Sequence, residues 1–515
     1  MTSFALIPLD ERPVNTRCPA MIAAIAGLEV RLPPLDLLSQ QRQPADTDRL
    51  GAWVTDQFGT VDTMIASVEM LAFGGLLASR IDSTPLQSAL ARLDVLKAKG
   101  DCRLYAFNVI TRIPNADDAR EEPSYWAQWG RQIHRYSQWM HRAELDASVQ
   151  AALAAAHADL PADVIADFTE RRLRNHLLNL HMLGLAAGGA VDTLVLSSDD
   201  TSVYGMGSQE KAWLHIWARR FGLPPERLLM YPGADEVGCV LLMRAAHERA
   251  GAAHERAAHA PTFYIAYAIE ADREIVAPYE DSPIRVTVER QIAALGGRIV
   301  ERADQADLIV AVNPPTRMQT EYDPAHPLYA AETARRQPAL VTFTHQIREW
   351  IDAGRRVIVA DVAYPNGSDP ALIDLLRERV NLPRLAAYGA WNTAGNTIGT
   401  ALAQGAALMM GMAVDASPEQ RAAMEEAQAR FLLHRFIEDW GYQHLVRDQV
   451  RAALESVYGE REPTSETEAW AITQIHERLN ALLPRLGRLA EGWRIGRVWL
   501  PWHRTFEIDF ELERL

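Results

Sequence analysis

Short apolar segments alternate with longer amphipathic segments along most of the chain. The apolar segments, which are rich in β-branched and aromatic residues, are residues 4–9, 63–68, 103–110, 193–198, 228–231, 262–268, 308–312, 357–362 and 385–388. Most are continuously apolar, which is typical of parallel strands covered by helices on both faces. Helical periodicity fills the intervals, for example at residues 84–98, 125–147, 210–221 and 286–295. This alternation predicts an α/β fold, with a (β/α)8 barrel favoured and an open doubly wound sheet as the alternative.

The pattern changes near Asp415, where the strand-like segments give way to helix. We predict a (β/α)8-barrel-like catalytic region over residues 1–415, with a small flavodoxin-like α/β insert at 261–315. A mainly helical region follows over residues 416–515, and Ser417 followed by proline is a typical helix start. Residues 494–512 alternate apolar and polar positions, as at 506–511, which predicts one C-terminal strand with one side in solvent.

Composition and charge argue against several classes of partner and site. With 515 residues, 48% of them hydrophobic, the chain can bury a large core. The 52 Lys and Arg against 67 Asp and Glu give a net charge of −15, and no basic stripe or tail is present, so nucleic acid is not expected as a partner. Cys18, Cys102 and Cys239 are far apart and form no CxxC pair, which argues against disulfides and a thiolate zinc site.

The sequence shows neither a signal peptide nor a segment typical of a membrane-spanning helix. The N-terminal segment lacks the basic start, long apolar stretch and cleavage site of a signal peptide. The most apolar segments are either too short to span a bilayer or interrupted by polar residues. We therefore expect a cytoplasmic protein without a membrane partner. The sequence is compatible with either a monomer or a homo-oligomer.

Acidic, amide and aromatic residues follow many of the predicted strands. They are Asp10, Arg12, Glu69, Asn108, Asp199, Asp200, Asp235, Glu236, Asn313, Asp361, Tyr388, Trp391 and Asn392. In parallel α/β folds, functional residues gather at the carboxyl ends of strands. Any single acid could instead cap the next helix. The recurrence at equivalent strand ends nevertheless predicts a shared substrate-binding site.

The adjacent acids Asp199 and Asp200 are the candidate catalytic pair. Neighbouring carboxylates repel each other, which raises the pKa of one and leaves the other ionised. A general acid and a charged stabiliser need this arrangement. A diacid turn that caps a helix is the structural alternative.

Tyr388, Trp391 and Asn392 form a second candidate cluster. Tryptophan offers a flat apolar face to a sugar ring or nucleobase, and asparagine can bind hydroxyl or amide groups. A buried tryptophan beside a capping asparagine is the structural alternative.

Other catalytic patterns are missing, and no cofactor is predicted. The chain has no GxSxG elbow, no P-loop and no HExxH motif. We predict no metal site, although Asp10, Asp199 and Asp361 are residue types that bind Mg²⁺ or Ca²⁺.

Five motifs resemble a bacterial family catalogued as domain of unknown function 4127. They are PLDERPVN at 8–15, EMLAFGGL at 69–76, SDD at 198–200, GADEVG at 233–238 and GAWNTAGNT at 389–397. Together they extend over most of the chain from about residue 4. The family name implies no activity, so the chemistry must come from the residues.

The strand followed by Asp199 and Asp200 also resembles O-GlcNAcase-type β-N-acetylglucosaminidases, which are barrel enzymes with substrate-assisted catalysis. This resemblance implies that Asp199 orients the substrate acetamido group and stabilises charge. It implies that Asp200 acts as general acid and then as base, and that Trp391 and Asn392 line the sugar pocket.

These features lead to one function and two alternatives. The leading hypothesis is a glycoside hydrolase that acts on a small glycoside or N-acetylhexosaminide through paired carboxylates, by a substrate-assisted retaining route where the acetamido group is present. The alternatives are a divalent-metal-dependent hydrolase or lyase on a polyhydroxylated substrate, and a non-catalytic intracellular sugar-binding protein.

Overall fold

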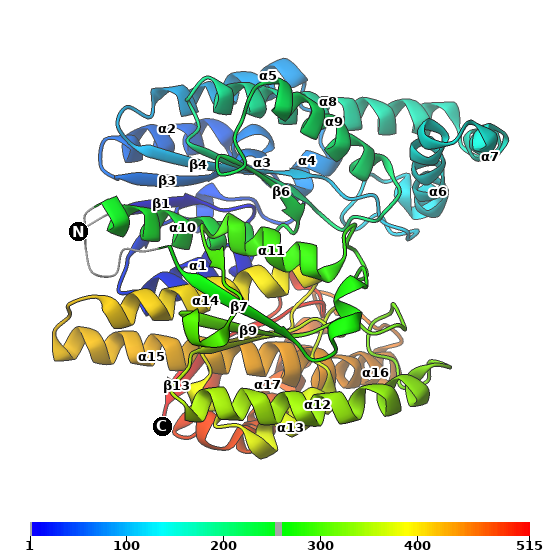
Figure 1. Cartoon of the computed structure of the whole chain (residues 1–515). Helices are drawn as coiled ribbons and strands as arrows, with labels where there is room; N and C mark the ends of the chain where they lie inside the picture. Colours follow the sequence, from blue (N-terminus) through cyan, green and yellow to red (C-terminus); the bar gives the residue numbers. More distant parts are fainter. Residues whose placement is uncertain (1–2, 253–259) are drawn as a thin grey trace. The chain divides into compact units, whose positions relative to one another are not determined.

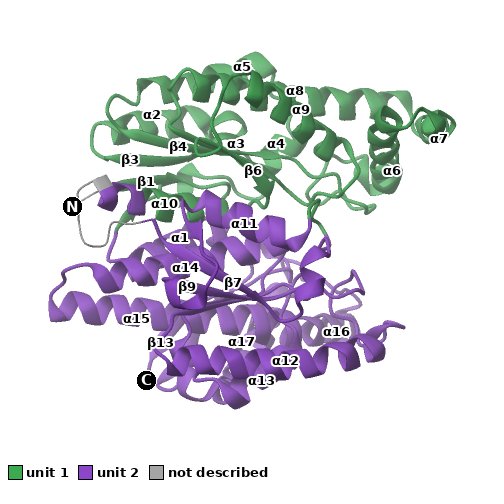
Figure 2. Ribbon diagram, in the orientation of Figure 1, with its two compact units in different colours: residues 1–11, 29–245, 279–282 green, residues 12–28, 246–278, 283–515 purple. Residues whose placement is uncertain are grey.

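A computed structural model describes residues 3–252 and 260–515. The chain divides into two compact units (Figure 2). Unit 1 consists of Met1–Glu11, Glu29–Ala245 and Tyr279–Ser282. Unit 2 consists of Arg12–Leu28, Ala246–Pro278 and Pro283–Leu515. The predicted change of character near Asp415 therefore lies inside unit 2.

Unit 1 contains a six-stranded sheet in the order β2-β1-β3-β4-β5-β6, and every neighbouring pair is parallel. Its strands are β1 (Phe4–Ile7), β2 (Val30–Arg31), β3 (Thr63–Ser67), β4 (Arg103–Ile110), β5 (Thr193–Ser198) and β6 (Leu228–Pro232). The first five strands follow the 2-1-3-4-5 order of flavodoxin-like folds, in which the order reverses between the first and third strands. Nearly all residues of these strands apart from β2 are buried, as their continuous apolar sequences require.

Unit 2 contains a five-stranded parallel sheet in the order β11-β10-β9-β7-β8. Its strands are β7 (Thr262–Tyr267), β8 (Arg298–Ile299), β9 (Leu308–Asn313), β10 (Val357–Asp361) and β11 (Ala387–Gly389). Counted within the unit, this order is again 2-1-3-4-5. A separate antiparallel pair is formed by β12 (Trp493–Trp499) and β13 (Asp509–Arg514). The C-terminal segment predicted as one strand thus contains two.

Helices cover the sheets, and Figure 1 labels the α-helices. Those of unit 1 are α2 (Thr47–Phe58), α3 (Val68–Phe73), α4 (Leu76–Ile81), α5 (Leu86–Arg92), α6 (Trp126–Leu145), α7 (Gln150–Ala158), α8 (Ala162–Ala187) and α9 (Met206–Arg220). Helix α10 (Val237–Ala252) begins in unit 1 and ends in unit 2. Those of unit 2 are α1 (Pro13–Ile25), α11 (Ile284–Ala294), α12 (Tyr329–Asp352), α13 (Pro370–Arg379), α14 (Ala394–Ala413), α15 (Pro418–Arg435), the π-helix η7 (Phe436–Val446), α16 (Arg447–Tyr458) and α17 (Glu468–Leu482).

Short 3-10 helices complete the chain. They are η1 (Leu35–Leu37), η2 (Leu93–Ala98), η3 (Ala147–Val149), η4 (Glu270–Glu274), η5 (Ala303–Gln305), η6 (Leu382–Arg384), η8 (Leu483–Leu489) and η9 (Pro501–His503). The start of α15 has the predicted chemistry, since the Ser417 hydroxyl accepts from the Gln420 backbone N–H and the Gln420 side chain accepts in return. An apolar core lies in each unit: α8 packs against β4 and β5 in unit 1, and α12 packs against β10 in unit 2.

The mixed α/β fold with parallel sheets is confirmed. Each apolar segment predicted as a strand in the first 400 residues is one, although several bounds differ by one or two residues. These strands divide between two sheets instead of joining in one, and the pairing in unit 1 runs from β2 at one edge to β6 at the other. A closed (β/α)8 barrel is therefore not confirmed. The two-residue strands β2 and β8 have no hydrophobic pattern, and strand pattern alone does not specify which strands pair. The predicted insert at 261–315 supplies β7, β8 and β9 of the second sheet.

The helices also bear on the membrane prediction. Within the described residues, no helix combines the length and the apolar character that crossing a membrane requires.

Candidate functional site

A pocket of about 550 Å³ lies in unit 1 beyond the carboxyl ends of β4 and β5. The loop after β4, the loop after β5 and the start of α9 line it. Its charged lining residues are Arg112, Asp118, Arg120, Glu121, Asp199 and Asp200. Hydroxyl groups are also frequent in the lining, from Ser137, Ser198, Thr201, Ser202 and Ser208. The volume falls within the usual range for small-molecule sites.

The end of β5 places Asp199 and Asp200 in the pocket wall. The Asp199 backbone N–H donates to the carbonyl of Ile110, at 3.1 Å, which continues the pairing of β5 with β4. Asp200 then takes a left-handed φ of 35°, a conformation that aspartate adopts more readily than most residues. Pairing with β4 thus extends one residue past the end of β5, to Asp199, and both acids line the same pocket.

Two arginines hold the acid pair. Arg80 of α4 donates to the Asp199 carboxylate, and the Arg112 Nη1 atom lies 3.1 Å from Asp200 Oδ2. Arg80 also lies 3.3 Å from Glu121, and Arg112 Nη2 lies 2.9 Å from the same carboxylate. Each arginine therefore binds one aspartate and shares Glu121.

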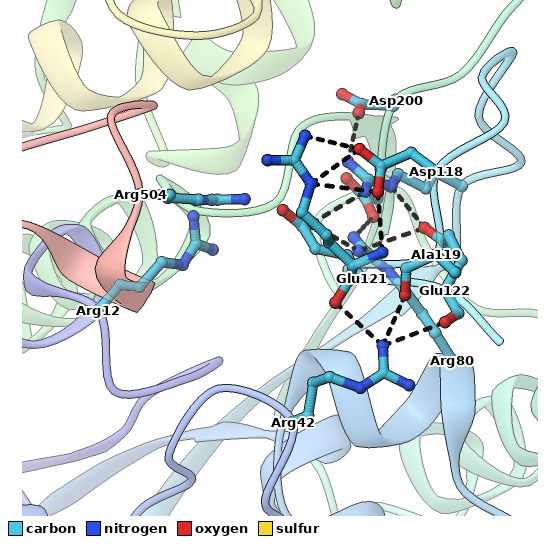
Figure 3. Close-up of polar contacts among 12 residues, drawn as sticks. Arg12, Arg42, Arg80, Asp118, Ala119, Glu121, Glu122, Asp200 and Arg504 are labelled. Carbon is cyan, nitrogen blue, oxygen red and sulfur yellow. Dashed lines mark hydrogen bonds and ion pairs between the residues drawn. The ribbon is translucent and has the colours of Figure 1, made fainter. Parts of the chain in front are cut away.

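Glu122 completes this network, and Figure 3 shows its position beside Arg80 and Glu121. Its carboxylate lies 2.9 Å from Arg112 Nε and 3.6 Å from Arg80 Nη1. Its backbone carbonyl accepts a hydrogen bond from Arg42, whose Nη1 atom also donates to the carbonyls of Ala119 and Arg120, at 3.1, 2.8 and 2.9 Å respectively. Arg42 thus fixes the loop that carries both glutamates.

The electrostatic surroundings raise the pKa of Asp200. Burial is the largest cause and the Asp199 carboxylate is the second, while Arg112 and Arg80 oppose them. Burial also lowers the pKa of Arg112, but the carboxylates of Glu122, Asp200 and Asp199 raise it by more. The pocket therefore combines a carboxyl group that retains its proton more readily with a carboxylate paired to Arg80.

Polar groups around the acid pair are suited to hydroxyl ligands. His134 Nδ1 lies 2.8 Å from the carbonyl of Ile113, so this nitrogen carries a hydrogen. The Ser198 side chain is buried, and its Oγ has no hydrogen-bond partner among the described residues. Thr201 Oγ1 lies 3.3 Å from Ser208 Oγ.

The other predicted residues of unit 1 are buried, and none is among the described residues that line this pocket. Glu69 accepts a hydrogen bond from the Val109 backbone at 2.7 Å, and burial, with a smaller contribution from Asp199, raises its pKa to about 8. Asn108 donates to Asn179 of α8. Glu236 accepts from the Ala234 backbone at 2.9 Å immediately before α10.

Two further predicted acids of unit 1 follow other strands. Asp10 comes after β1, and Asp235 comes after β6. Both are buried. The pocket is therefore built at β4 and β5, whereas Asp10 and Glu69 follow the strands at which the sheet order reverses.

The remaining predicted residues belong to unit 2. Asn313 donates to Asp361 at 2.8 Å and to Asp369 at 3.1 Å, and burial followed by the Asp369 carboxylate raises the pKa of Asp361 to about 7. Arg12 lies 3.5 Å from Glu507 and over the ring of Trp502.

The aromatic cluster of unit 2 is packed inside that unit. Tyr388 stacks on Phe436 with ring centroids 4.1 Å apart. Trp391 is 4% exposed and meets Phe506 edge-on. Asn392 has a left-handed φ of 60°, and its carbonyl accepts from the backbone of Asn366.

Four residues of this network were not predicted from the sequence: Arg80, Arg112, Glu121 and Glu122. A signal for three of them exists, because the loop after β4 is dense in charge over residues 112–122. Arg80 has no such signal, since it lies in an apolar helix and is separated from Asp199 by 119 positions.

No group of three or more His, Cys, Asp or Glu side chains in the described part of the chain is arranged to hold a metal ion. Of the acids considered for a cation, Asp10 and Asp199 belong to unit 1 and Asp361 to unit 2.

Fold and site together define an α/β protein with two parallel-sheet units, one of which carries a pocket lined by an arginine–carboxylate network. A family profile described as a protein of unknown function, DUF4127, matches residues 4–511. The chain belongs to this family, which confirms the resemblance carried by the sequence motifs. Comparison with curated proteins and with solved structures finds no match.

Proposed function

We propose that the pocket of unit 1 is the active site of a glycoside hydrolase, with Asp200 as general acid and Asp199 as charged stabiliser. The observation that carries this proposal is the contrast between two adjacent carboxylates that line one pocket. Asp199 is paired with Arg80, while the pKa of Asp200 is raised by burial and by Asp199. An acid and an ionised partner are the minimum equipment for cleaving a glycosidic bond.

Exposure supports the same assignment of roles. The Asp200 side chain is 25% exposed, whereas that of Asp199 is 10% exposed. A general acid must reach the leaving-group oxygen, so the more accessible and more readily protonated carboxyl is the better acid. Asp199, held by Arg80, is suited to a fixed negative charge that stabilises positive charge in the transition state.

The rest of the pocket supports a small polyhydroxylated substrate. Ser202, Ser208 and Thr201 line it with hydroxyl groups that donate and accept hydrogen bonds. A volume of about 550 Å³ suits a small glycoside or an N-acetylhexosaminide. With an N-acetylated sugar, Asp199 would orient the acetamido group and the reaction would be substrate-assisted and retaining.

A panel of nitrophenyl glycosides, including N-acetylhexosaminides, tests this proposal. We expect the wild-type protein to turn over at least one of them. On the alkyl glycoside of the same sugar, whose poor leaving group needs protonation, Asp200→Asn should lower turnover by about 100-fold or more. Asp94→Asn is the matched control, because Asp94 is an exposed acid of unit 1 outside the pocket. Folded wild-type protein that cleaves no glycoside contradicts the proposal.

Two added measurements separate the alternatives. Sugar binding by calorimetry without turnover, unchanged by Asp200→Asn, would indicate a non-catalytic sugar-binding protein. Loss of turnover after exhaustive chelation, with recovery on adding Mg²⁺, would indicate a metal-dependent enzyme. We expect turnover that survives chelation.

A further inference from the structure

Glu122 is buried behind the pocket wall and does not line the pocket. The residue is 3% exposed, and its carboxylate contacts Arg112 Nε at 2.9 Å and Arg80 Nη1 at 3.6 Å. The exposed side chain of Arg42 donates a hydrogen bond to the backbone carbonyl of Glu122 (Figure 3). Its position therefore allows it to act on a ligand only through the two arginines.

Arg112 divides its guanidinium among three carboxylates. Nε faces Glu122, Nη2 faces Glu121 and Nη1 faces Asp200. An arginine that served Asp200 alone would strongly favour the ionised form of that carboxyl group. Two further carboxylates on the same guanidinium offset its charge, so Arg112 can orient Asp200 without forcing it to ionise.

We propose that Glu122 is a positioning residue of this site, which offsets the charge of Arg112 and fixes its guanidinium against Asp200. The catalytic consequence rests on the proposed function, whereas the charge balance is a property of the folded protein alone. Glu121 is the less suitable candidate, because it lines the pocket and is within reach of a ligand.

The charged groups that act on Asp200 come from three elements. They are Asp199 at the end of β5, Arg112 on the loop after β4 and Arg80 on α4. Glu121 and Glu122 act through the two arginines. The other titratable groups that line the pocket are Asp118, which is paired with Arg120, His134 and Tyr279.

Carboxyl labelling measures the protonation of Asp200 without any substrate. A water-soluble carbodiimide and an amine modify protonated carboxyl groups, and tandem mass spectrometry locates the product at residue 200 over a pH series. We expect Glu122→Gln to move the midpoint of Asp200 labelling down by about one pH unit, because Arg112 then acts on Asp200 with less compensation. An unchanged or raised midpoint in folded Glu122→Gln overturns the proposal.

Two further variants keep the test decisive if Glu122→Gln does not fold. Glu122→Asp retains the charge, and we expect its midpoint to lie within a few tenths of a pH unit of the wild type. Arg112→Gln removes the opposing charge, and we expect its midpoint to rise by about one pH unit. A midpoint in Arg112→Gln that falls or stays unchanged contradicts the charge balance. Asp94→Asn serves as the control for general changes in labelling.

Activity supplies the second readout. On the substrate found with the glycoside panel, the basic limb of the wild-type pH profile reports the general acid. We expect Glu122→Gln to move this limb to lower pH by the same amount as the labelling midpoint, and Glu122→Asp to restore it. If no glycoside is cleaved, the proposed function fails while the labelling result still decides the role of Glu122. If glycosides are cleaved and the limb does not move, the role of Glu122 fails alone.

Discussion

The two units share a strand order but differ in the structure around the carboxyl ends of their strands. In unit 1, the ends of β4 and β5 open into the pocket that contains Asp199 and Asp200. In unit 2, Asp361 at the end of β10 and Asp439 of η7 are buried, and Asp439 accepts a hydrogen bond from the Ala390 backbone just after β11. A π-helix thus packs over the strand ends of unit 2, whereas charged loops border those of unit 1.

This comparison shows that acidic residues at strand ends are not sufficient to make a site. Both regions contain arginines that bind several carboxylates: Arg112 in unit 1, and Arg435, which contacts Glu438 and Asp439, in unit 2. Accessibility separates them, because the Asp200 side chain is 25% exposed and that of Asp439 is fully buried. We therefore propose a catalytic role for the first network and a stabilising role for the second.

The largest expected effect is on the stability of unit 2. Arg435→Met should lower the free energy of unfolding by about 3–5 kcal/mol, because Glu438 and Asp439 would stay buried without their cation. Urea unfolding measures this. Arg302→Met is the control, since Arg302 and Asp304 form an exposed pair and its loss should not be detectable. A loss as small as that of the control would mean that the buried network contributes little.

A smaller effect, on activity, is expected from Arg80. Arg80→Gln should lower turnover by about 10-fold or more with little change in KM, because Asp199 loses a charged partner that holds its carboxylate in place. Steady-state kinetics on the substrate from the glycoside panel measure it. Arg120→Gln is the matched comparison, because Arg120 lines the same pocket and forms its ion pair with Asp118, outside the acid pair. Equal losses in both variants would remove the special role of Arg80.

A third effect concerns the pH dependence of stability. The folded state raises the pKa of Glu69 from 4.5 to about 8, mainly through burial. Between these values the unfolded chain releases a proton that the folded chain keeps, so the free energy of unfolding falls as pH rises. Glu69→Gln keeps the hydrogen bond from Val109 and removes the titration. We expect urea unfolding of this variant to depend less on pH between about 5 and 8 than that of the wild type. An equal or steeper dependence contradicts this.

The smallest expected effect is from Arg42, which holds the loop of Glu121 and Glu122 from the surface. Arg42→Ala should lower turnover by only a few-fold, because the loop loses three hydrogen bonds to its carbonyls but keeps its ion pairs. Kinetics together with the labelling midpoint of Asp200 check this. A loss as large as that of Arg80→Gln would mean that the position of the loop with Glu121 and Glu122 matters as much for the acid pair as the ion pair of Arg80.

Much of the fold could be predicted from the sequence, and only part of the site. Continuous apolar segments identify strands such as β4 and β5 because burial on both faces requires them. The division into two sheets could not be read, since pairing depends on contacts between distant segments. Asp199 and Asp200 were predicted from their place after β5, but Arg112 is 88 positions from Asp200, and no local pattern links them. Trp391 follows a strand end in the sequence, yet in unit 2 it is buried against Phe506.

The central claim is that Asp200 is the general acid, and a leaving-group series tests it most directly. Aryl glycosides whose phenols differ in acidity are compared in wild type, Asp200→Asn and Asp199→Asn, with thermal melts to confirm folding. An acid variant is rescued by good leaving groups, which need little protonation, so the loss in Asp200→Asn should shrink as the phenol becomes more acidic. The loss in Asp199→Asn should be the same for every leaving group, because its charge acts on all transition states alike. Equal, leaving-group-independent losses in both variants would contradict the assignment of Asp200 as the acid.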